Sequence, residues 1–178
     1  GGEVGFIGSV GDDIIGNYLY DFCTKLNYDY LDLYKDPYHN TTLAFVENDL
    51  NGERSFSFFR QNTADYHINY DRLSVIKDAN IIHVGSLMLR EEEGRRLATK
   101  IFETAKKENK LISFDVNFRD DIFPSFEVAK QIYTEYIKNA DILKFSIDEV
   151  KLFTGNDDCS SISSLVRDDQ LVFITLGS

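Results

Sequence analysis

The segment Asp115-Val116-Asn117-Phe118-Arg119 combines three side chains whose chemistry suits a phosphate group. Alternate residues of an extended chain share one face, so Asp115, Asn117 and Arg119 are expected to project together. That face would offer a carboxylate, an amide and a guanidinium, and a guanidinium can bind phosphate through two parallel hydrogen bonds. The alternative is a solvated loop with a local ion pair. The functional interpretation predicts a site where fixed donors hold negative charge.

A second candidate is the run Ser146-Ile147-Asp148-Glu149, which precedes an apolar helical pattern. Ser-x-x-Glu in this position is typical of a capping box, which would explain both polar residues without any function. Glu149 could instead order water bound to magnesium near a phosphate, because this cation takes few protein carboxylates and keeps several waters. Both interpretations stay open at this point.

The glycine-rich run Gly8-Ser9-Val10-Gly11-Asp12 is a weak nucleotide motif. It lacks the lysine of a P-loop, and its glycines do not have Gly-x-Gly-x-x-Gly spacing. We interpret it as a tight turn between a strand at 4–8 and a helix whose apolar residues begin at Ile15. The missing dinucleotide motif also disfavours a Rossmann-type dehydrogenase, which is an alternative enzyme class.

Four apolar segments, each ended by glycine, a hydroxyl or a charge, predict the strands that position these residues. The expected strands are 81–84, 111–114, 142–145 and 171–176. Helical patterns between them imply parallel strands joined by right-handed crossovers. We expect an α/β body with helices on both faces of the sheet, and ligands beyond the carboxyl ends of the strands. Those ends are Gly85-Ser86, 115–119, 146–149 and 175–178.

Two of the predicted helices carry clear signals. Pro124-Ser125 begins one of them, and its apolar positions are Val128, Ile132, Tyr136 and Ile137. The other is a short helix from Glu149 to Phe153 that Gly155 ends.

In residues 41–60, side chains instead alternate with the two-residue period of a β-strand. Two β-rich runs flank Asn51-Gly52, which is a strong signal for a hairpin. We expect an antiparallel hairpin that stands off the body as a lid. The predicted division is therefore 1–40 as the start of the α/β body, 41–66 as the lid and 67–178 as the continuing body.

The composition limits the functional classes. The chain has 178 residues, 43% of them hydrophobic, and a net charge of −11, which predicts a folded acidic domain. The acidity argues against nucleic acid and against an anionic membrane surface, because both require clustered Lys and Arg. No apolar run approaches the roughly 20 residues of a membrane span. The two cysteines, Cys23 and Cys159, suit a reduced, cytoplasmic location.

These residues, in this order, resemble the ribokinase-like (PfkB) carbohydrate kinases, and the fructokinase branch most closely. The resemblance covers almost the whole chain, and the ordered set of motifs carries it. The motifs are Val4-Gly5-Phe6-Ile7-Gly8-Ser9-Val10-Gly11-Asp12-Asp13-x-x-Gly16, Thr42-x-Ala44-Phe45-Val46, Gly52-Glu53-Arg54, Phe58-Phe59-Arg60, Ala64-Asp65, His83-x-Gly85-Ser86, Asp115-x-Asn117-x-Arg119, Lys144-x-Ser146-x-x-Glu149 and Thr175-Leu176-Gly177-Ser178.

The resemblance implies a three-layer sandwich with a mostly parallel central sheet and a small β lid. It also implies ATP-dependent transfer of a phosphoryl group to a sugar hydroxyl, with Mg²⁺ and with fructose as the expected sugar. Ribose, 2-keto-3-deoxygluconate and adenosine are the alternative substrates, and a non-catalytic sugar-binding module is the alternative function. A homodimer through the lid is a further expectation.

The resemblance also assigns roles to individual residues. Arg119 would stabilise the transition state, and Glu149 would act on the metal through water. The expected sugar contacts are Gly2, Phe58, Arg60, Asn117 and Arg119. The expected nucleotide contacts are Lys144, Ser146, Thr175 and Gly177, although many family members have Asn in place of Ser146.

Two family motifs are missing. The Gly-Ala-Gly-Asp motif, whose aspartate is the catalytic base, would lie beyond Ser178, so the 178 residues alone are expected to be inactive. Gly1-Gly2 either belongs to an early Gly-Gly motif followed by about 20 absent residues, the usual size of a helix and its turns, or is a remnant of cloning.

Overall fold

The structure is a computed structural model that describes residues 2–48, 54–119 and 123–177. It divides into two compact units, Gly1–Arg72 and Leu73–Ser178. The first unit contains β1 (Gly5–Gly11), α1 (Ile14–Cys23), β2 (Tyr30–Asp36), β3 (Leu43–Asn48), β4 (Arg54–Phe59) and the 3₁₀ helix η1 (Ala64–Tyr66). The 3₁₀ helix η2 (Tyr70–Asp78) lies at the boundary.

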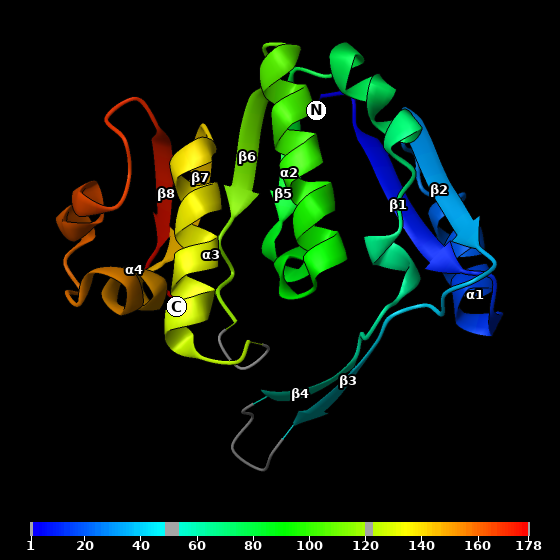
Figure 1. The fold of residues 1–178 in the computed structure, drawn as a ribbon, viewed down its shortest axis with the longest axis horizontal. Coiled ribbons are helices and arrows are strands. Elements are labelled where there is room, and N and C mark those ends of the chain that lie inside the picture. The colour runs from blue at the N-terminus through cyan, green and yellow to red at the C-terminus, as the bar shows by residue number, and fades with distance from the viewer. Residues whose placement is uncertain (1, 49–53, 120–122, 178) are drawn as a thin grey trace. The chain divides into compact units, whose positions relative to one another are not determined.

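The second unit alternates strands and helices, as predicted (Figure 1). Its elements are β5 (Ile81–Gly85), η3 (Ser86–Arg90), α2 (Glu92–Lys107), β6 (Leu111–Asp115), α3 (Phe126–Asn139), β7 (Ile142–Ser146), α4 (Ile147–Thr154), η5 (Cys159–Ser164) and β8 (Leu171–Thr175). None of the described helices is long and apolar enough to cross a membrane.

The four strands of this unit form one parallel sheet in the order β5-β6-β7-β8. The register pairs Gly85 with Asp115, and Ser146 with Thr175. The carboxyl ends of neighbouring strands therefore lie side by side. This arrangement confirms the predicted parallel α/β sheet and places the predicted strand-end residues along one edge.

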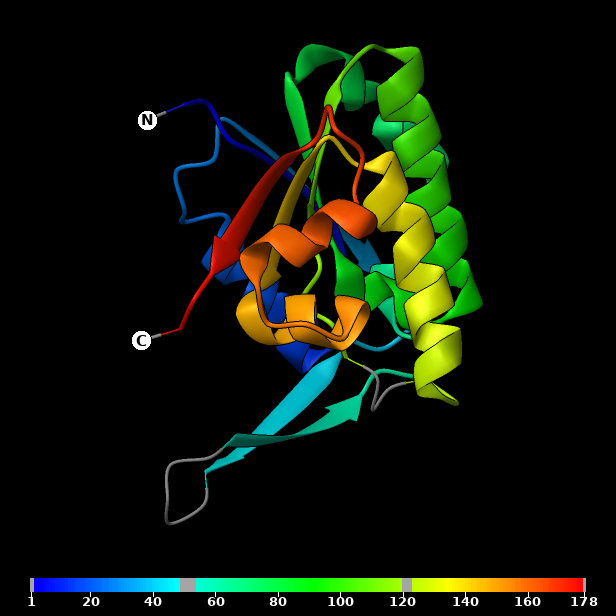
Figure 2. The same cartoon turned by 90° about the vertical axis from the view of Figure 1, so that its left-hand side faces the viewer.

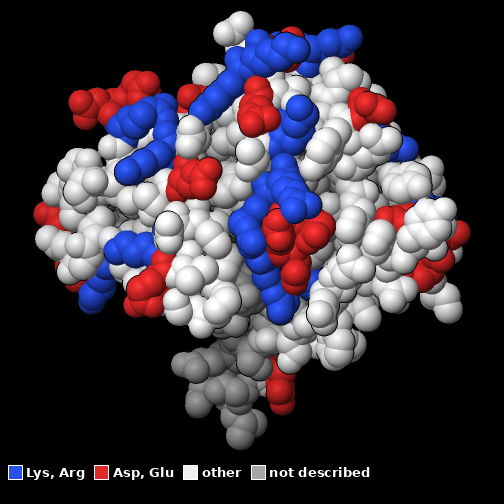
Figure 3. All heavy atoms as spheres, viewed as in Figure 1, with Lys and Arg blue, Asp and Glu red and all other residues white. Residues whose placement is uncertain are grey.

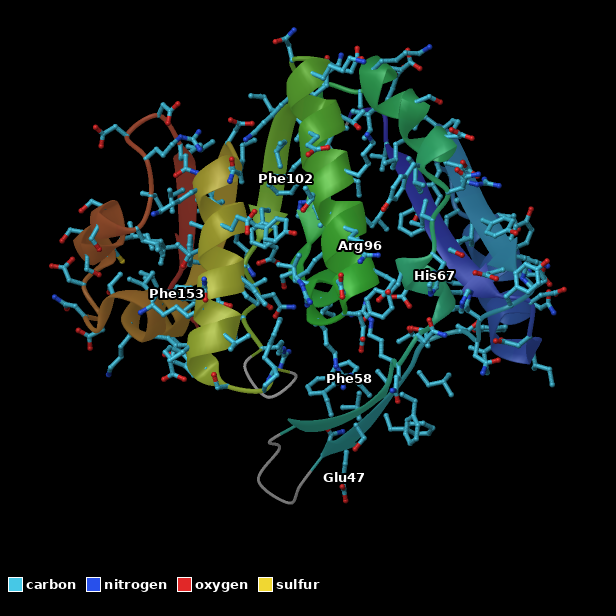
Figure 4. The ribbon with its side chains drawn as sticks, in the orientation of Figure 1. Glu47, Phe58, His67, Arg96, Phe102 and Phe153 are labelled. Carbon is cyan, nitrogen blue, oxygen red and sulfur yellow. The ribbon has the colours of Figure 1, made fainter. Side chains whose placement is uncertain are left out.

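One face of the sheet is the core of the unit. Ile112, Phe114, Leu143 and Phe145 have no exposed surface, because alternate residues of each strand point to this face. The ring of Phe114 packs against Phe102 of α2 and against two tyrosines of α3, and that of Phe145 packs against Phe153 of α4 (Figure 4). In Figures 1 and 2, α2 and α3 lie side by side over this face.

The opposite face of the sheet carries exposed residues. Leu171 and Phe173 of β8 are each 54% exposed, and Leu111 of β6 is 50% exposed. Within the described part of this unit, the main strand contacts of α2, α3 and α4 are with β6 and β7, on the side of the buried face. The prediction of helices on both faces is thus confirmed for one face and stays a prediction for the other.

The first unit contains two small sheets. β1 pairs with β2 in parallel, and β2 was not among the predicted strands. β3 and β4 form the predicted antiparallel hairpin, with Leu43 opposite Phe59 and Val46 opposite Phe56. The predicted Asn51-Gly52 turn lies outside the described residues. Whether the hairpin acts as a lid stays a prediction.

The turn after β1 is held by a dense set of hydrogen bonds. Asp13 caps α1 by accepting from the Gly16 backbone at 2.7 Å, and it also accepts from the backbone and hydroxyl of Thr41 at 2.7 and 3.0 Å. The Thr41 hydroxyl oxygen in turn accepts from the Gly11 backbone at 2.9 Å. Burial would raise the pKa of Asp13, but the hydrogen bonds from Gly16 and Thr41 outweigh it and lower the pKa. The sequence predicted a strand at 4–8 that ends in a glycine turn, but β1 continues to Gly11 and the tight turn into α1 lies at Asp12–Asp13. That prediction is therefore wrong for most of the glycine-rich run, which belongs to the strand.

Candidate active site

The segment after β6 forms a turn at the carboxyl edge of the four-stranded sheet. The hydrogen-bonded pairing of β6 with β7 continues for one residue beyond β6, since the Val116 backbone donates to the carbonyl of Lys144 at 3.1 Å. Asn117 then adopts a φ of 30°, a left-handed conformation that Asn tolerates better than most residues. The prediction that Asp115 to Arg119 is extended is therefore wrong, because β6 ends at Asp115 and the chain turns at Asn117.

Two elements hold this turn by hydrogen bonds. The hydroxyl of Ser86, at the start of η3, donates to the carbonyl of Asn117 at 3.3 Å. The carboxylate of Glu149, in α4, accepts from the Phe118 backbone at 2.6 Å. Both Ser86 and Glu149 belong to strand-end runs that the sequence singled out. Hydrogen bonds thus connect three of the predicted strand ends at this edge of the sheet.

Aromatic packing fixes the centre of the turn. The ring of Phe118 lies edge-on to Phe126, Tyr133 and Phe153, with centroid distances of 5.8, 4.8 and 5.0 Å. Phe118 thus anchors the chain between Asn117 and Arg119. Neither Phe118 nor Tyr133 was predicted as part of the site. For Phe118, the signal in the sequence was an apolar residue between two polar site candidates.

Glu149 forms the predicted capping box. Its carboxylate accepts from the Ser146 backbone at 2.7 Å, and the Ser146 hydroxyl accepts from the Glu149 backbone at 3.2 Å. One carboxylate therefore accepts from two backbone N–H groups, that of Ser146 at the end of β7 and that of Phe118 in the turn after β6. A carboxylate has about four acceptor positions, so each oxygen can still accept a hydrogen bond from water. This geometry is compatible with the outer coordination sphere of Mg²⁺, which keeps several waters.

Lys144 and Asp115 form an ion pair on neighbouring strands. The ammonium lies 3.2 Å from both carboxylate oxygens, and the two side chains are 46% and 32% exposed. A pair this exposed contributes little to stability. Asp115 therefore pairs across the sheet to Lys144, and Lys144 remains accessible at the strand ends.

The last strand completes this edge. The Thr175 hydroxyl donates to the carbonyl of Phe145 at 3.3 Å, so it faces the end of β7. Gly177 has a φ of 80°, a left-handed conformation that glycine adopts without strain, and no atom of the described residues lies within 4 Å of its Cβ position.

The remaining predicted sugar contacts lie in the first unit. Arg60 forms an ion pair with Asp65, with its Nε 3.0 Å from the carboxylate, and its guanidinium lies over the ring of Tyr66 at 4.8 Å. Phe58, in the hairpin, stacks on Phe56 at 5.9 Å (Figure 4). Gly2 is exposed, and none of the described residues has an atom within 4 Å of its Cβ position.

Asp65 is the centre of the Arg60 cluster. Its carboxylate also accepts from the hydroxyls of Thr42 at 2.5 Å and Thr63 at 2.7 Å. Burial would raise the pKa of Asp65, but the charge of Arg60 and these hydroxyls outweigh it and lower the pKa. The carboxylate stays charged at neutral pH and holds the guanidinium in place.

Charged side chains of both signs are interspersed on the face shown in Figure 3. On α2, for example, Arg96 pairs with Glu92 at 2.5 Å while both side chains remain more than 60% exposed. Within the part of the chain that the structure describes, no three His, Cys, Asp or Glu residues gather as a candidate metal site.

Comparisons with known proteins agree with this architecture. The model of the pfkB family of carbohydrate kinases matches residues 1–178. Probable fructokinase-2 of Arabidopsis thaliana is 35% identical over 182 residues, which cover 99% of this chain and 55% of that protein. Fructokinase-2 of Solanum lycopersicum is 34% identical and covers 99% of this chain and 56% of that protein.

Solved structures show the same likeness. The fructokinase of Xylella fastidiosa with bound ATP has a TM-score of 0.82 at 27% identity, covering 98% of this chain and 57% of that one. The fructokinase of Vibrio cholerae O395 in its fructose, ADP and calcium ion bound form has a TM-score of 0.81 at 26% identity, covering 99% and 58%. The chain spans about half the length of the curated relatives it matches. With its parallel sheet, its polar strand-end edge and a family match over its whole length, this chain belongs to the pfkB family of carbohydrate kinases.

Proposed function

We propose that the protein containing this chain transfers the γ-phosphoryl group of ATP to a sugar hydroxyl, with fructose as the first substrate. The observation that carries the proposal is the turn at Asn117–Arg119, which three elements hold at the carboxyl edge of the sheet. Relatives named fructokinase, and neighbours with bound ATP or with fructose and ADP, support the choice of substrates.

At this turn, Arg119 and Asn117 would provide the fixed donors that phosphoryl transfer requires. Charge spreads over the oxygens of the moving group in the transition state. Donors that are already in place stabilise this charge without reorganisation. Arg119 would act on the phosphoryl group, and Asn117 would contact both the group and the sugar.

Glu149 would orient water on the metal side of the phosphates. Mg²⁺, when bound with the nucleotide, would neutralise charge on the phosphate oxygens. Both carboxylate oxygens of Glu149 already hold backbone N–H groups, so the carboxylate cannot swing away from this edge. We therefore assign it a role through water and not as a direct ligand.

The nucleotide would lie along the ends of β7 and β8. Lys144 offers an ammonium, Ser146 and Thr175 offer hydroxyls, and Gly177 offers backbone in a left-handed conformation. Among the described acids at this edge, Asp115 is paired with Lys144 and Glu149 is engaged by backbone groups. The resemblance to the family implies that the group that takes the proton of the sugar hydroxyl belongs to a motif beyond Ser178, and the chain alone would then be inactive.

In the first unit, Gly2, Phe58 and Arg60 would contact the sugar. Arg60 has five N–H donors, and Asp65 uses only part of them, so the remaining donors can bind a sugar hydroxyl. The pair with Asp65 would orient the guanidinium for this contact. The free thiols of Cys23 and Cys159 suit the cytoplasmic location that is part of this proposal.

The hairpin would also join two subunits. It is apolar on both faces: Phe45 and Phe59, which are 59% and 63% exposed, meet edge-on at 5.6 Å on one face, and Val46 and Phe56 lie on the other. A lone two-stranded ribbon with so much apolar surface requires cover. We propose that the same element of a second copy covers one face. Light scattering of the complete gene product should give the dimer mass, and monomer alone at micromolar concentration would contradict this.

The test of the proposed function is an assay of the complete gene product with ATP and Mg²⁺. Fructose, ribose, 2-keto-3-deoxygluconate and adenosine are offered separately, and ADP release and the phosphorylated product are both measured. We expect turnover with fructose to exceed turnover with the others. Preference for another acceptor would overturn the substrate, and sugar binding without ADP release from any of them would indicate a non-catalytic module.

A further inference from the structure

A buried tyrosine lies directly behind the turn that presents Arg119. Tyr133 of α3 has no exposed surface, and its ring packs against Phe118 at a centroid distance of 4.8 Å. It also contacts Phe114 at 6.4 Å and Phe123 at 5.9 Å. Packing alone would be served equally well by phenylalanine, so the hydroxyl requires a separate explanation.

The hydroxyl of Tyr133 lies in the polar cluster at the turn. Its oxygen is buried and makes no hydrogen bond of regular geometry among the described residues. Burial raises the pKa of this hydroxyl, while the side chain of Ser86 and the backbone of Arg119 lower it less strongly. The charge of Glu149 adds to the rise, and that of Arg119 opposes it. The group is therefore protonated at neutral pH and available as a donor beside Arg119.

Two successive residues of the turn are thus held by hydrogen bonds from two different elements, and a third element packs against them. Ser86, only 2% exposed, holds the carbonyl of Asn117, and Glu149 holds the backbone of Phe118. The ring of Tyr133, of the third element, packs against Phe118 at 4.8 Å, and its hydroxyl lies near the backbone of Arg119. A left-handed residue such as Asn117 persists only where its surroundings determine the backbone.

We propose that Tyr133 is a positioning residue, whose hydroxyl, together with Ser86, sets the backbone at Asn117–Arg119 and so aims the Arg119 side chain at the phosphoryl group. The proposal rests on the proposed kinase function. Tyr133 itself would not touch either substrate. Its effect would reach the reaction only through Arg119.

The test replaces the hydroxyl without disturbing the ring. Tyr133→Phe in the complete gene product should lower kcat roughly 10-fold, because small displacements of an aligned group cost large factors in rate. The KM for the sugar should change less than about twofold, as for a substitution away from the binding contacts. A merely structural role would lower the amount of folded enzyme and leave kcat per folded molecule unchanged.

Tyr136→Phe is the matched control. Tyr136 lies on the same helix and is 5% exposed, and its hydroxyl contacts the Thr99 hydroxyl and the Arg95 carbonyl of α2, each at 3.1 Å. The substitution also removes a tyrosine hydroxyl from the core of this unit, but on the side that faces α2. We expect its kcat to stay within about twofold of wild type.

A double-mutant cycle shows whether Tyr133 acts through Arg119. If it does, Tyr133→Phe should cause no further loss of kcat in an Arg119→Ala background, because coupled residues are not additive. Full additivity, or equal kinetics of the two Tyr→Phe variants, would overturn the proposal.

Hydrogen exchange provides a readout that does not depend on activity. Tyr133→Phe should speed exchange in a peptide covering residues 116–119, whereas Tyr136→Phe should not. An inactive wild type would refute the kinase function, and this comparison would still decide whether Tyr133 holds the turn. Unchanged exchange at 116–119 in Tyr133→Phe would overturn the positioning role.

Discussion

Arg119→Ala in the complete gene product should lower kcat by a factor of a hundred or more and leave the fold intact. Loss of one preorganised donor to developing charge typically costs about 3–4 kcal/mol of transition-state stabilisation. Arg119 follows a turn that is anchored by Phe118, and the anchor remains after the side chain is removed. Steady-state kinetics together with thermal unfolding would measure both effects.

Two further variants sharpen this prediction. Arg96→Ala removes an exposed arginine that pairs with Glu92 on α2, and its kcat should match wild type. Asn117→Ala should lower kcat in the same direction as Arg119→Ala but more weakly, and part of its loss would come from placing alanine at a φ of 30°. Near-normal turnover by Arg119→Ala would mean that the turn is structural.

Gly16→Ala should destabilise the first unit severely, by at least about 3 kcal/mol, as expected where added atoms meet a rigid backbone. In an ordinary helix this substitution would stabilise by about 1 kcal/mol. Here a Cβ on Gly16 would overlap the carbonyl oxygen of Gly11 and lie 2.8 Å from the Thr41 hydroxyl. Denaturant unfolding, monitored by circular dichroism, would measure the loss.

Gly5→Ala is the matched control for this substitution. A Cβ on Gly5 would meet its nearest neighbour, the side chain of Tyr30, at 3.5 Å, which is an ordinary contact. We expect a change within about 1 kcal/mol, of the size of strand propensity effects. If Gly16→Ala were as stable as Gly5→Ala, the close approach of α1 to the turn after β1 would be wrong.

The parallel sheet could be predicted because buried parallel strands appear as apolar runs. The same reasoning did not predict β2. Its residues 31–35 are Leu, Asp, Leu, Tyr and Lys, and all five are half-buried. Such a strand shows neither a continuous apolar run nor a clean alternation. Its pairing with β1 is a long-range property that local pattern does not contain.

The helix α3 shows why Tyr133 was missed. The sequence marked Val128, Ile132, Tyr136 and Ile137, yet Val128 is 41% exposed, whereas Ala129 and Tyr133 are fully buried. The apolar side chains of this helix occur around most of its circumference. Their spacing therefore predicts the helix but not which of its sides faces the sheet. That choice depends on the rings of Phe114 and Phe118.

The candidate site was predictable in its residue types and its place in the fold. Parallel strands bring their carboxyl ends together, which is why Ser86 and Glu149 could be grouped with 115–119 in advance. The left-handed turn at Asn117 could not be predicted, because the strand period favours an extended chain there. The double use of Glu149, as a cap and as the acceptor for Phe118, likewise depends on the fold.

Hydrogen exchange with bound substrates tests the central claim most directly. The complete gene product is compared alone and saturated with a non-hydrolysable ATP analogue, Mg²⁺ and fructose. Peptides covering 115–119, 144–149 and 175–177 should exchange more slowly in the complex, because ordered ligand contacts suppress local opening. Unchanged exchange in all three peptides under saturating ligand would contradict the assignment of this sheet edge as the phosphate end of the active site.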